Sequence, residues 1–417
     1  MREVFVIGVG LTHFGMHADK TVGDLAREAV QAALGDADVT AKDIGFTAFA
    51  NTAQGALDGQ FGIKGQHALR PIGIEGAPFI NVENACTGSS AALNLAFTQV
   101  AGGFVDVALA VGAEKLYTED RAKRMALFSQ PLDLQGVQMF VDRYAPLVED
   151  VKPPPEAVID EAMRSVFMDT YAINSKLHMK RYGSTWRQLA AVSAKNHYHS
   201  TMNPLAQYQK DMSIEQVMRA RVISWPLTIP MCAPISDGGS AVIICSREAL
   251  PRFAARRAVK ILGTALKAGT TRDIADVENA ALRLTAKAAY AQAGLQPEDI
   301  SVAEVHDASA FGEINQVEMV GLCEFGQGGV MAEEGATRLG GRIPVNVSGG
   351  LESRGHPIAA TGLAQIAELV HQLRGEAGER TVEGARYALS ACSGGFMGVE
   401  DVACCVTILG KGGLTNN

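Results

Sequence analysis

The feature that most constrains the fold is an internal duplication. A strand-like run at Val4–Val9 has a counterpart at Val259–Gly263, and an alanine-rich pattern with apolar residues at helical spacing follows each run. Each helical pattern then reaches an Asp-Ile pair, at Asp43–Ile44 in the first half and at Asp299–Ile300 in the second. A third echo sets the segment PFINV beside PVNV. Repeats at nearly equal separations predict two copies of one structural unit.

Strands that alternate with helices predict an α/β fold with mostly parallel sheets. Three strongly apolar runs, DVALAVGAE, AVIIC and DVACCVTIL, are typical of central strands that are covered on both faces. A chain of 417 residues, 47% of them hydrophobic, can bury a large core. We expect an N-terminal half at residues 1–114 and 235–250, an inserted loop domain of different character at 115–234, and a C-terminal half at 251–417.

Charge and cysteine content bear on partners and compartment. The net charge of −8 argues against nucleic-acid binding, because proteins that bind phosphates normally carry an excess of Lys and Arg. The seven cysteines include no CxxC pair and mostly have apolar neighbours, which is typical of a reduced intracellular protein. The N-terminus lacks the pattern of a signal peptide, and no segment has the length of a membrane span. We therefore predict a cytoplasmic protein with no membrane and no nucleic acid among its partners.

The sharpest chemical signal is NVENACTGSSAALNLAF, in which a strand turns at Asn84–Gly88 and a small-residue helix begins. Cys86 at this turn would face the positive end of the helix dipole, which stabilises the nucleophilic thiolate. The small residues that follow leave room for a substrate to approach. Taken alone, a cysteine in this setting is more often structural than catalytic.

Two further motifs can complete the chemistry. The segment GGLESRGHPIAATG holds His356 between a glycine and a proline, where it can take a proton from the cysteine or merely brace the turn. For this motif in isolation the bracing role is slightly favoured. The segment YALSACSGGFMG ends a strand at Cys392, and the glycines after it, including Gly394, can point N–H groups at an oxyanion or simply close the sheet.

A fourth motif, VAEVHDASAFGEI, places His306 and Asp307 at a strand end, where open α/β sheets gather their active sites. Other candidates are weaker, since Cys404 and Cys405 lie in an apolar strand and His197 and His199 lack cysteines at zinc-finger spacing. We predict no metal. The segment IGVGLTHFG lacks the third glycine of a dinucleotide fingerprint, so a nicotinamide cofactor is not indicated.

These four motifs, in this order on a duplicated α/β chain, resemble the thiolase superfamily over almost the entire length. The nucleophile motif matches around Cys86, the GHP motif is Gly355–Pro357, and the Cys-x-Gly motif is Cys392–Gly394. The remaining motif, His306–Ser309, resembles that of the sterol-carrier-protein-type branch, and within it this chain resembles the bacterial acetyl-CoA acetyltransferase-like proteins. Many members of that branch carry a cysteine inside the HD motif and none in the C-terminal loop. This chain shows the reverse, with Ala308 in the HD motif.

The resemblance implies a duplicated thiolase fold with five αβαβα layers and two mixed, mostly parallel sheets. It also implies a thiolase, an acyl-CoA C-acyltransferase that cleaves a 3-oxoacyl-CoA with coenzyme A or runs the reverse condensation. Cys86 would become acylated, His356 would help to activate it, and Cys392 would exchange a proton with the enolate. His306 and His356 would polarise the enolate oxygen, while the N–H groups of Cys86 and Gly394 would form the other oxyanion hole. Coenzyme A would be a substrate, and no cofactor would be required.

Rival functions remain open. A decarboxylating ketoacyl synthase also uses a Cys-His-His set, but Cys392 favours the thiolase because decarboxylation generates the enolate without a second cysteine. A related retro-aldol lyase is disfavoured because its members generally lack this cysteine pair. A non-catalytic acyl-CoA-binding scaffold is the alternative from another class. Relatives often associate with a small zinc-ribbon and OB-fold protein, which could also accompany an active enzyme, and the resemblance further implies a homodimer or a dimer of dimers.

The acyl chain is less constrained than the chemistry. Similarity to bacterial relatives favours degradation of a branched, aromatic or otherwise bulky 3-oxoacyl-CoA, with benzoylsuccinyl-CoA as one candidate. Five residues of the insertion could shape a bulky pocket, although core packing is the more frequent role for such side chains: Met163, Phe167, Met168, Tyr171 and Met179. No residue is assigned to the coenzyme A phosphates, and the basic residues in the region are Lys180, Arg181, Arg219 and Arg221.

Overall fold

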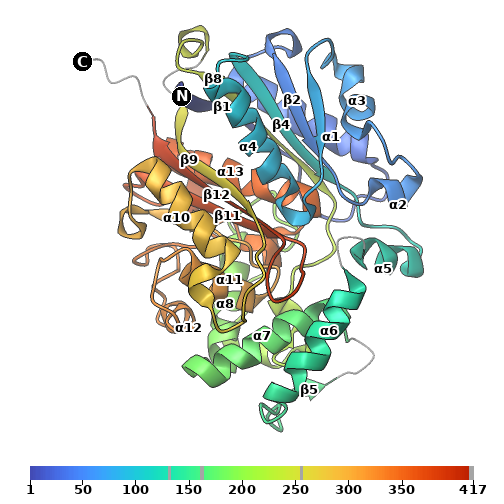
Figure 1. The fold of residues 1–417 in the computed structure, drawn as a ribbon, viewed down its shortest axis with the longest axis vertical. Coiled ribbons are helices and arrows are strands. Elements are labelled where there is room, and N and C mark those ends of the chain that lie inside the picture. Colours follow the sequence, from blue (N-terminus) through green and yellow to red (C-terminus); the bar gives the residue numbers. More distant parts are fainter. Residues whose placement is uncertain (130–132, 160–163, 254–256, 413–417) are drawn as a thin grey trace.

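A nine-stranded mixed sheet forms the centre of the protein (Figure 1). The computed structural model describes residues 1–129, 133–159, 164–253 and 257–412. The strands follow one another across the sheet in the order β10-β11-β12-β9-β1-β8-β4-β2-β3. In chain order they are β1 (Val4–Leu11), β2 (Phe46–Ala50), β3 (Phe79–Val82), β4 (Val107–Glu114), β8 (Gly238–Ser246), β9 (Val259–Ala268), β10 (Val302–Glu304), β11 (Tyr387–Gly394) and β12 (Ala403–Lys411).

The strand pairing repeats between the two halves of the sheet. In the first half β4 is parallel to β2 and antiparallel to β8, and β8 is antiparallel to β1. In the second half β11 is parallel to β10 and antiparallel to β12, and β12 is antiparallel to β9. A parallel bridge from Ala303 to Val345 stands where β2 pairs with β3 in the first half. The predicted duplication is therefore confirmed.

Two details of the predicted sheets are wrong. Among the described strands of the large sheet, three neighbouring pairs are parallel and five are antiparallel, so the sheet is mixed but not mostly parallel. The halves are also joined into one sheet, because Val4–Val6 of β1 pairs with Val259–Ile261 of β9. Apolar runs report that both faces of a strand are covered, and this pattern does not distinguish an antiparallel central strand from a parallel one.

Helices complete five αβαβα layers. The outer face of the first half is covered by α1 (Val22–Ala37) and α3 (Lys64–Leu69), and that of the second half by α10 (Ala281–Ala293). Between the halves lie α4 (Gly88–Ala101) and α13 (Thr361–Arg374), whose apolar residues join one continuous core (Figure 1). Almost every residue of α13 is buried, as expected for a helix that has sheet on both sides.

Two duplicated glycines allow the outer helices to approach the sheet closely. A Cβ atom on Gly8 would lie 2.4 Å from the carbonyl oxygen of Ala33 in α1. A Cβ atom on Gly263 would lie 2.5 Å from the carbonyl oxygen of Ala289 in α10. The same residue type is therefore required at the same place in both copies, because any larger side chain would push the helix away.

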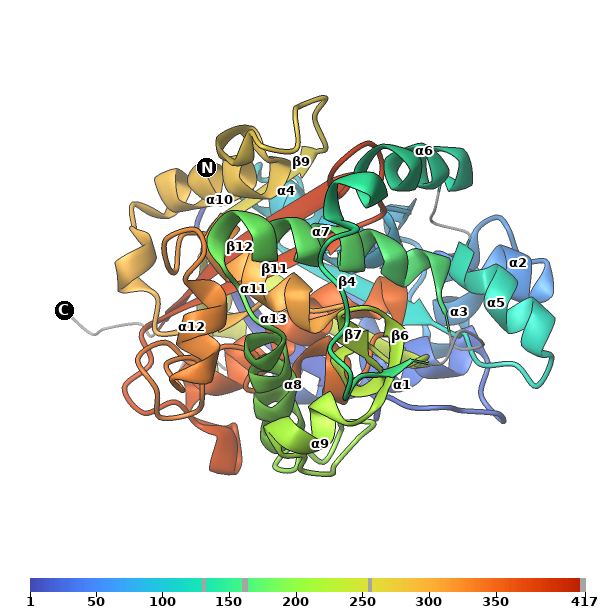
Figure 2. The same cartoon turned by 90° about the horizontal axis from the view of Figure 1, so that it is seen from below.

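The segment between β4 and β8 packs on one side of the two halves (Figures 1 and 2). It contains α5 (Arg121–Ser129), α6 (Leu134–Tyr144), α7 (Val166–Tyr182), α8 (Trp186–Ser200), α9 (Ile214–Met218) and a small sheet of β5 (Val158–Ile159), β6 (Arg221–Ser224) and β7 (Leu227–Thr228). Fully buried Lys195 of α8 anchors it, since its Nζ lies 2.9 Å from Glu313 of α11 (Ala310–Met319). The predicted domain boundaries stay a prediction.

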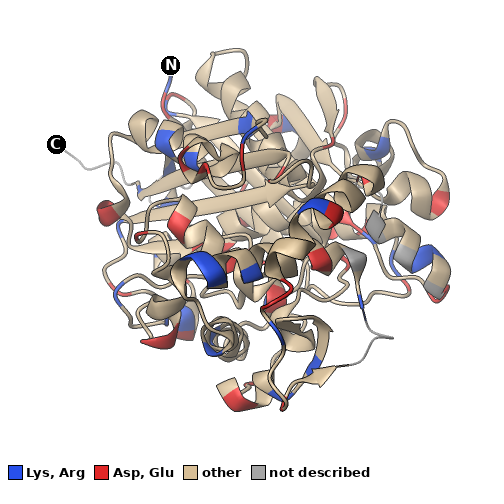
Figure 3. Cartoon of the chain, turned by 60° about the horizontal axis from the view of Figure 1, so that its bottom comes forward, with Lys and Arg blue, Asp and Glu red and all other residues tan. Residues whose placement is uncertain are grey.

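Two short helices, α2 (Gln54–Asp58) and α12 (Gly328–Glu333), lie at opposite sides of the view in Figure 1. Within the described residues, every helix falls short of the length and apolar character needed to cross a bilayer. Acidic and basic residues are interspersed over the elements in Figure 3. The predicted absence of a nucleic-acid partner remains a prediction.

Candidate active site

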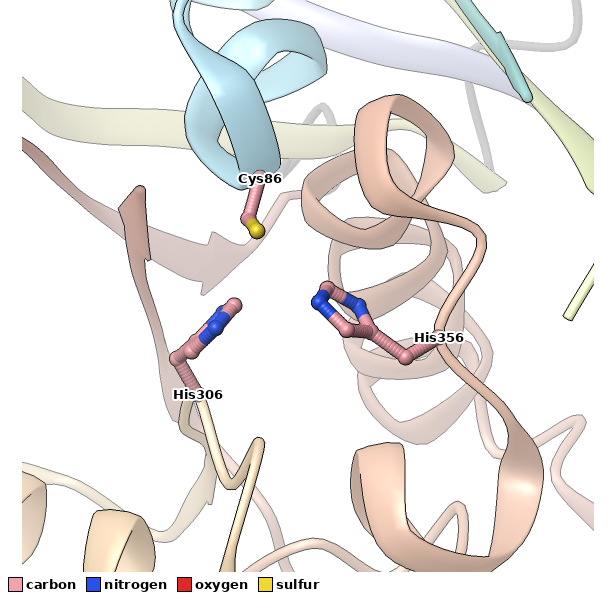
Figure 4. Close-up of side chains that lie close together, drawn as sticks. All are labelled: Cys86, His306 and His356. Atoms are coloured by element: carbon pink, nitrogen blue, oxygen red, sulfur yellow. The ribbon is translucent and has the colours of Figure 1, made fainter. Parts of the chain in front are cut away.

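The four sequence motifs converge at one place in the fold. Cys86 follows β3, His306 follows β10, and His356 lies between a turn at Gly350–Arg354 and α13. Cys392 lies near the end of β11. Figure 4 shows the side chains of Cys86, His306 and His356 pointing toward a common space. The chain thus brings together residues from both copies of the duplicated unit.

Cys86 lies in a tight turn at Ala85–Thr87 that leads directly into α4. Its neighbour Ala85 has a φ of 47°, a left-handed conformation that is costly for a residue with a side chain. Only 8% of Cys86 is exposed, and burial together with nearby Cys392 raises the pKa of its thiol well above the usual value. The predicted stabilisation of the thiolate by the helix is thus outweighed by burial in the resting site, which holds a neutral thiol.

Two neutral imidazoles face this thiol. The sulfur of Cys86 and one nitrogen from each of His306 and His356 all lie within 4.8 Å of one another. The two rings stand nearly perpendicular, at 85°, with their centroids 5.1 Å apart. Burial and then Arg354 lower the pKa of His306 to about 3, and burial, His306 and Arg354 lower the pKa of His356 well below its usual value. Both rings are uncharged near neutral pH, so either can accept a proton.

A neighbouring hydroxyl fixes the tautomer of His356. The Thr361 hydroxyl donates to the carbonyl of Pro357 over 3.1 Å, so its oxygen accepts from Nδ1 of His356, which lies 2.7 Å away. With the proton on Nδ1, the Nε2 lone pair is left for another partner. His356 can therefore act as a base through Nε2 without first losing a proton.

The second thiol bridges the nucleophile turn and the other histidine. The sulfur of Cys392 lies 3.3 Å from the carbonyl oxygen of Cys86 and 3.6 Å from Nδ1 of His306. Burial raises the pKa of the Cys392 thiol to about 12, so it carries its proton at neutral pH. A protonated thiol beside a neutral imidazole is suited to donating that proton to a carbanion or enolate.

Gly394 is required by close packing against the nucleophile turn. A Cβ atom at this position would lie 2.6 Å from the carbonyl oxygen of Asn84 and 2.7 Å from the backbone nitrogen of Thr87. Strand β11 continues through Gly394, whereas the sequence pattern predicts that the strand ends before it. The glycine therefore brings the backbone of β11 against the turn that carries Cys86.

Several residues that hold the site have no motif of their own. The carbonyl oxygen of the Gln316 side chain accepts from the backbone nitrogen of His306 at 3.0 Å, and the Ser236 hydroxyl accepts from that of His356 at 2.9 Å. Buried Glu114 accepts from the backbone nitrogens of Ala53 and Ala359. The contacts of Ser236 and Glu114 join residues far apart in the sequence, and Gln316 lies outside the quoted motifs, so only Thr361, within the quoted GHP segment, carried a usable signal.

A small pocket surrounds the three side chains of Figure 4. Its other walls include Phe167 and Tyr171, two of the five residues considered for the acyl pocket. Met168 and Met179 instead pack in the apolar core of the insertion, and Met163 lies outside the described residues. Of the basic candidates, Lys180 and Arg181 line a larger adjoining cavity, whereas Arg219 and Arg221 are exposed on the surface.

The thiol and the two imidazoles are also atom types that bind zinc. Their mutual distances alone do not distinguish a metal site from a nucleophile with its base. The absence of a metal, which the sequence predicts, therefore stays a prediction.

Family models match both parts of the chain. Residues 4–221 match the N-terminal domain of thiolase, and residues 263–411 match the model described as thiolase C-terminal domain-like. The sequence is 36% identical to acetyl-CoA acetyltransferase of Methanothermobacter thermautotrophicus, with 96% of this chain and 99% of that protein covered. It is 36% identical to sterol carrier protein 2 of Bos taurus, over 93% of this chain and 69% of the relative.

A third relative and two solved structures extend the comparison. The chain is 31% identical to the benzoylsuccinyl-CoA thiolase subunit BbsB of Thauera aromatica, over 94% of this chain and 95% of that subunit. The Ltp2-ChsH2(DUF35) aldolase has the same fold, with a TM-score of 0.75 at 23% identity over 100% of this chain and 99% of that one. Human mitochondrial 3-ketoacyl-CoA thiolase also has this fold, with a TM-score of 0.69 at 18% identity over 98% of both chains. This chain therefore belongs to the thiolase family and is an acyltransferase.

Proposed function

We propose that this protein cleaves a 3-oxoacyl-CoA with coenzyme A, or performs the reverse condensation, through an acyl group carried on Cys86. The observation that supports this most is the pair of neutral thiols, Cys86 and Cys392, set around two neutral imidazoles. Cleavage of a carbon–carbon bond beside a thioester needs a nucleophile and a separate proton donor. Coenzyme A is a substrate in this scheme, and no further cofactor is required.

The first step is attack by Cys86. Nε2 of His356 takes the thiol proton, and the sulfur then adds to the 3-oxo carbonyl carbon of the substrate. Because both groups are neutral before the transfer, the ion pair forms only when substrate is in place to use it. Burial of the site strengthens every interaction with the developing oxyanion.

The second step breaks the carbon–carbon bond. The electron pair moves to the α-carbon of the departing thioester, whose enolate oxygen is polarised by His306 and by His356, now protonated. Cys392 delivers its proton to that carbon, which releases the shortened acyl-CoA. The resulting Cys392 thiolate is 3.6 Å from His306 and recovers a proton when coenzyme A enters as a thiol.

The third step transfers the acyl group from Cys86 to coenzyme A. The coenzyme thiolate attacks the Cys86 thioester, and the oxyanion accepts hydrogen bonds from the backbone N–H groups of Cys86 and Gly394. Collapse of this oxyanion releases the new acyl-CoA and expels the Cys86 thiolate, which takes back the proton held by His356. One such donor is usually worth roughly 10²–10³ in rate. The tight contact of Gly394 with the nucleophile turn is what sets these two N–H groups side by side in the proposal.

A chromatographic assay tests this function against its two rivals. Incubation of several 3-oxoacyl-CoA thioesters with coenzyme A should yield two new acyl-CoA products in equal amounts. Release of CO₂ from a malonyl thioester, with condensation in its place, would instead support the ketoacyl synthase. Failure of a folded sample to transfer any acyl group, with and without a partner protein, would support the scaffold.

Removal of the Thr361 hydroxyl should slow the reaction, because the proton of His356 would no longer be held on Nδ1. We expect Thr361→Val to lower kcat by roughly 10- to 100-fold, about the cost of one lost hydrogen bond to a buried polar group. Thr361→Ser keeps the hydroxyl and should restore most of the rate. The pH profile of kcat distinguishes a tautomer effect from loss of folding, and equal rates for the valine and serine variants would contradict the assignment.

The acyl chain is proposed to be branched, aromatic or otherwise bulky, and the direction degradative. The similarity to the benzoylsuccinyl-CoA thiolase subunit supports this, as do the aromatic residues Phe167, Tyr171 and Phe396 around the catalytic pocket. The same similarity makes benzoylsuccinyl-CoA, which would place a benzoyl group without a hydroxyl on Cys86, the reference aromatic substrate to assay. A cytoplasmic location is proposed with this role.

A homodimer formed through the edge of the sheet is also proposed. Strand β3 is the last strand of the first half, and its Ile80 is 42% exposed. Phe61 and Ile63, on the loop before α3, are 77% and 58% exposed. An exposed edge with apolar side chains favours pairing with a second chain.

A small zinc-ribbon and OB-fold partner is proposed as well, supported by the fold shared with the Ltp2-ChsH2(DUF35) aldolase.

A charge on this edge should separate the dimer. We expect Ile80→Lys to shift the mass measured by light scattering from twice the chain mass to the 44.0 kDa of one chain. Phe104→Lys is the matched control, because Phe104 is 77% exposed but follows α4 rather than lying on the edge. An unchanged dimer in the Ile80 variant would place the interface elsewhere.

A further inference from the structure

A second cavity of about 390 Å³ adjoins the catalytic pocket. It is bounded by α7, by the segment that leads from β9 into α10, and by the hairpin between β11 and β12. Tyr171, Phe396 and Asp401 line both spaces. A group attached to Cys86 can therefore extend past these three residues into the larger cavity, whose volume lies within the roughly 300–1,000 Å³ usual for ligand pockets.

The hairpin that carries Asp401 is held firmly in place. Glu400 accepts from the backbone nitrogen of Thr270 at 2.6 Å, from Nε of Arg272 at 2.7 Å and from the backbone nitrogen of Ala281 at 3.0 Å. Phe396 packs edge-on against Phe140 of α6, with the ring centroids 5.0 Å apart. These contacts fix both sides of the hairpin and so fix the wall that the two spaces share.

Adjacent carboxylates have different roles in this hairpin. Glu400 is fully engaged in the contacts that hold the hairpin, whereas the Asp401 carboxylate has the Ser393 hydroxyl as its partner and faces both spaces. Burial raises the pKa of Asp401 to about 6, with a smaller contribution from Glu400. Asp401 is thus a hydrogen-bond acceptor placed where an acyl chain passes.

The other charged groups on the cavity wall are already satisfied. Arg272 is paired with Glu400 at 2.7 Å, His178 with Glu318 at 2.9 Å, and Lys180 with Asp150 at 2.8 Å. The remaining cation, Arg181, donates to the carbonyl of Ala275 at 3.1 Å and lies over the ring of Tyr182. Among the described residues that line the cavity, no cluster of unpaired cations is therefore left for an anionic chain.

The neutral polar side chains that line the cavity have hydrogen-bonding groups left for a ligand. Within the described residues, the Asn315 amide and the Tyr171 hydroxyl line the cavity without a protein hydrogen-bond partner. Asn174 donates from Nδ2 to the carbonyl of Thr170, which leaves its Oδ1 to accept. A ligand group that both donates and accepts fits this set, and a hydroxyl is the simplest such group.

We infer that this cavity holds the acyl group of the substrate and selects ring-sized acyl groups that bear a hydroxyl, with Asp401 as the acceptor of that hydroxyl. The inference rests on the proposed thiolase function, because it places the acyl group on Cys86. Apolar and aromatic walls, including Phe311 and Leu282, enclose the ring. A hydroxyl beside Asp401 replaces the water that would otherwise bind there, so a chain without it leaves one carboxylate oxygen with no partner in the bound state.

Binding of stable analogues tests the inference separately from catalysis. The probes are coenzyme A thioethers, which cannot be cleaved, with tails ending in a phenyl, a para-hydroxyphenyl or a para-carboxyphenyl ring. By calorimetry, the wild-type protein should bind the hydroxyphenyl probe roughly tenfold or more tightly than the phenyl probe. Asp401→Leu should reduce that preference to within about twofold, while Asp401→Asn, which keeps an acceptor, should retain part of it.

Asp142→Asn, on the exposed face of α6, should leave the preference unchanged. Asn315→Leu is a second variant, which should lower the affinity for the hydroxyphenyl probe. It tests the inference even if Asp401→Leu proves unstable. Equal affinity for the phenyl and hydroxyphenyl probes, or tightest binding of the carboxyphenyl probe, would overturn the inference. A preference for the hydroxyphenyl probe without any cleavage of matching 3-oxoacyl thioesters would overturn the proposed thiolase function. The inferred selectivity of the cavity would still hold.

Discussion

Replacement of Cys86 by serine lowers kcat/KM for cleavage of a 3-oxoacyl-CoA by roughly 10⁴-fold or more, as expected when the nucleophile of a covalent mechanism is lost. A serine hydroxyl is far less acidic than a thiol, and burial makes ionisation harder still. His356 is a weak base in this setting, because its pKa is well below the ordinary value. It can deprotonate a thiol while substrate is bound but cannot generate an alkoxide at a useful rate.

Steady-state rates of purified, folded variants measure this effect. Cys323→Ser is the matched control, because Cys323 is only partly buried and packs at the edge of the apolar cluster between α10 and the sheet rather than at the site. It should keep activity within about twofold, since a substitution away from a buried contact changes stability little. Retention of more than a tenth of the activity by the Cys86 variant would remove Cys86 as the nucleophile.

Replacement of Cys392 by serine separates the two half-reactions. We expect acylation of Cys86 by an acyl-CoA to stay within about tenfold of the wild-type rate, because Cys86 and His356 suffice for that step. Carbon–carbon cleavage should fall by roughly 10²–10⁴-fold, the usual contribution of a positioned acid or base. The hydroxyl can still donate to His306, but it is a much poorer proton donor to the departing enolate.

Rapid-quench measurements of labelled acyl-enzyme, followed beside the overall reaction, distinguish these steps. The Cys323 variant again provides the reference for loss of a thiol that does not touch the site. Equal losses of acylation and cleavage in the Cys392 variant would show that this thiol supports the nucleophile rather than the enolate. The division of roles between the two cysteines would then be wrong.

The duplication and the meeting of the four motifs could be predicted because they rest on short-range patterns. Gly8 and Gly263 repeat at equivalent places, since each must let an outer helix touch the first strand of its copy. Cys86 and His356 follow segments that occupy equivalent places in the two copies, β3 and the stretch around Val345, so their motifs could be expected to meet. Strand direction was not predictable, because a run such as Gly238–Ser246 is buried on both faces whether its neighbours are parallel or antiparallel.

The electrostatics of the site could not be predicted from sequence. The helix that follows Cys86 suggests a stabilised thiolate, but whether burial outweighs the dipole depends on residues brought from distant segments, including Cys392 and Asp401. In the sequence, Asp401 cannot be told from a surface carboxylate. Its place at the cavity depends on the fold of the hairpin, which Glu400 holds in position. The tautomer of His356 likewise depends on whether the hydroxyl of Thr361 has a second partner at Pro357.

Intact-protein mass spectrometry after incubation with acyl-CoA and 3-oxoacyl-CoA thioesters, followed by peptide mapping, tests the central claim most directly. The proposed mechanism predicts one added acyl group per chain, located on Cys86, and its removal when coenzyme A is added. An adduct on another residue, or none from any thioester with a sample that binds coenzyme A, would contradict covalent catalysis by Cys86.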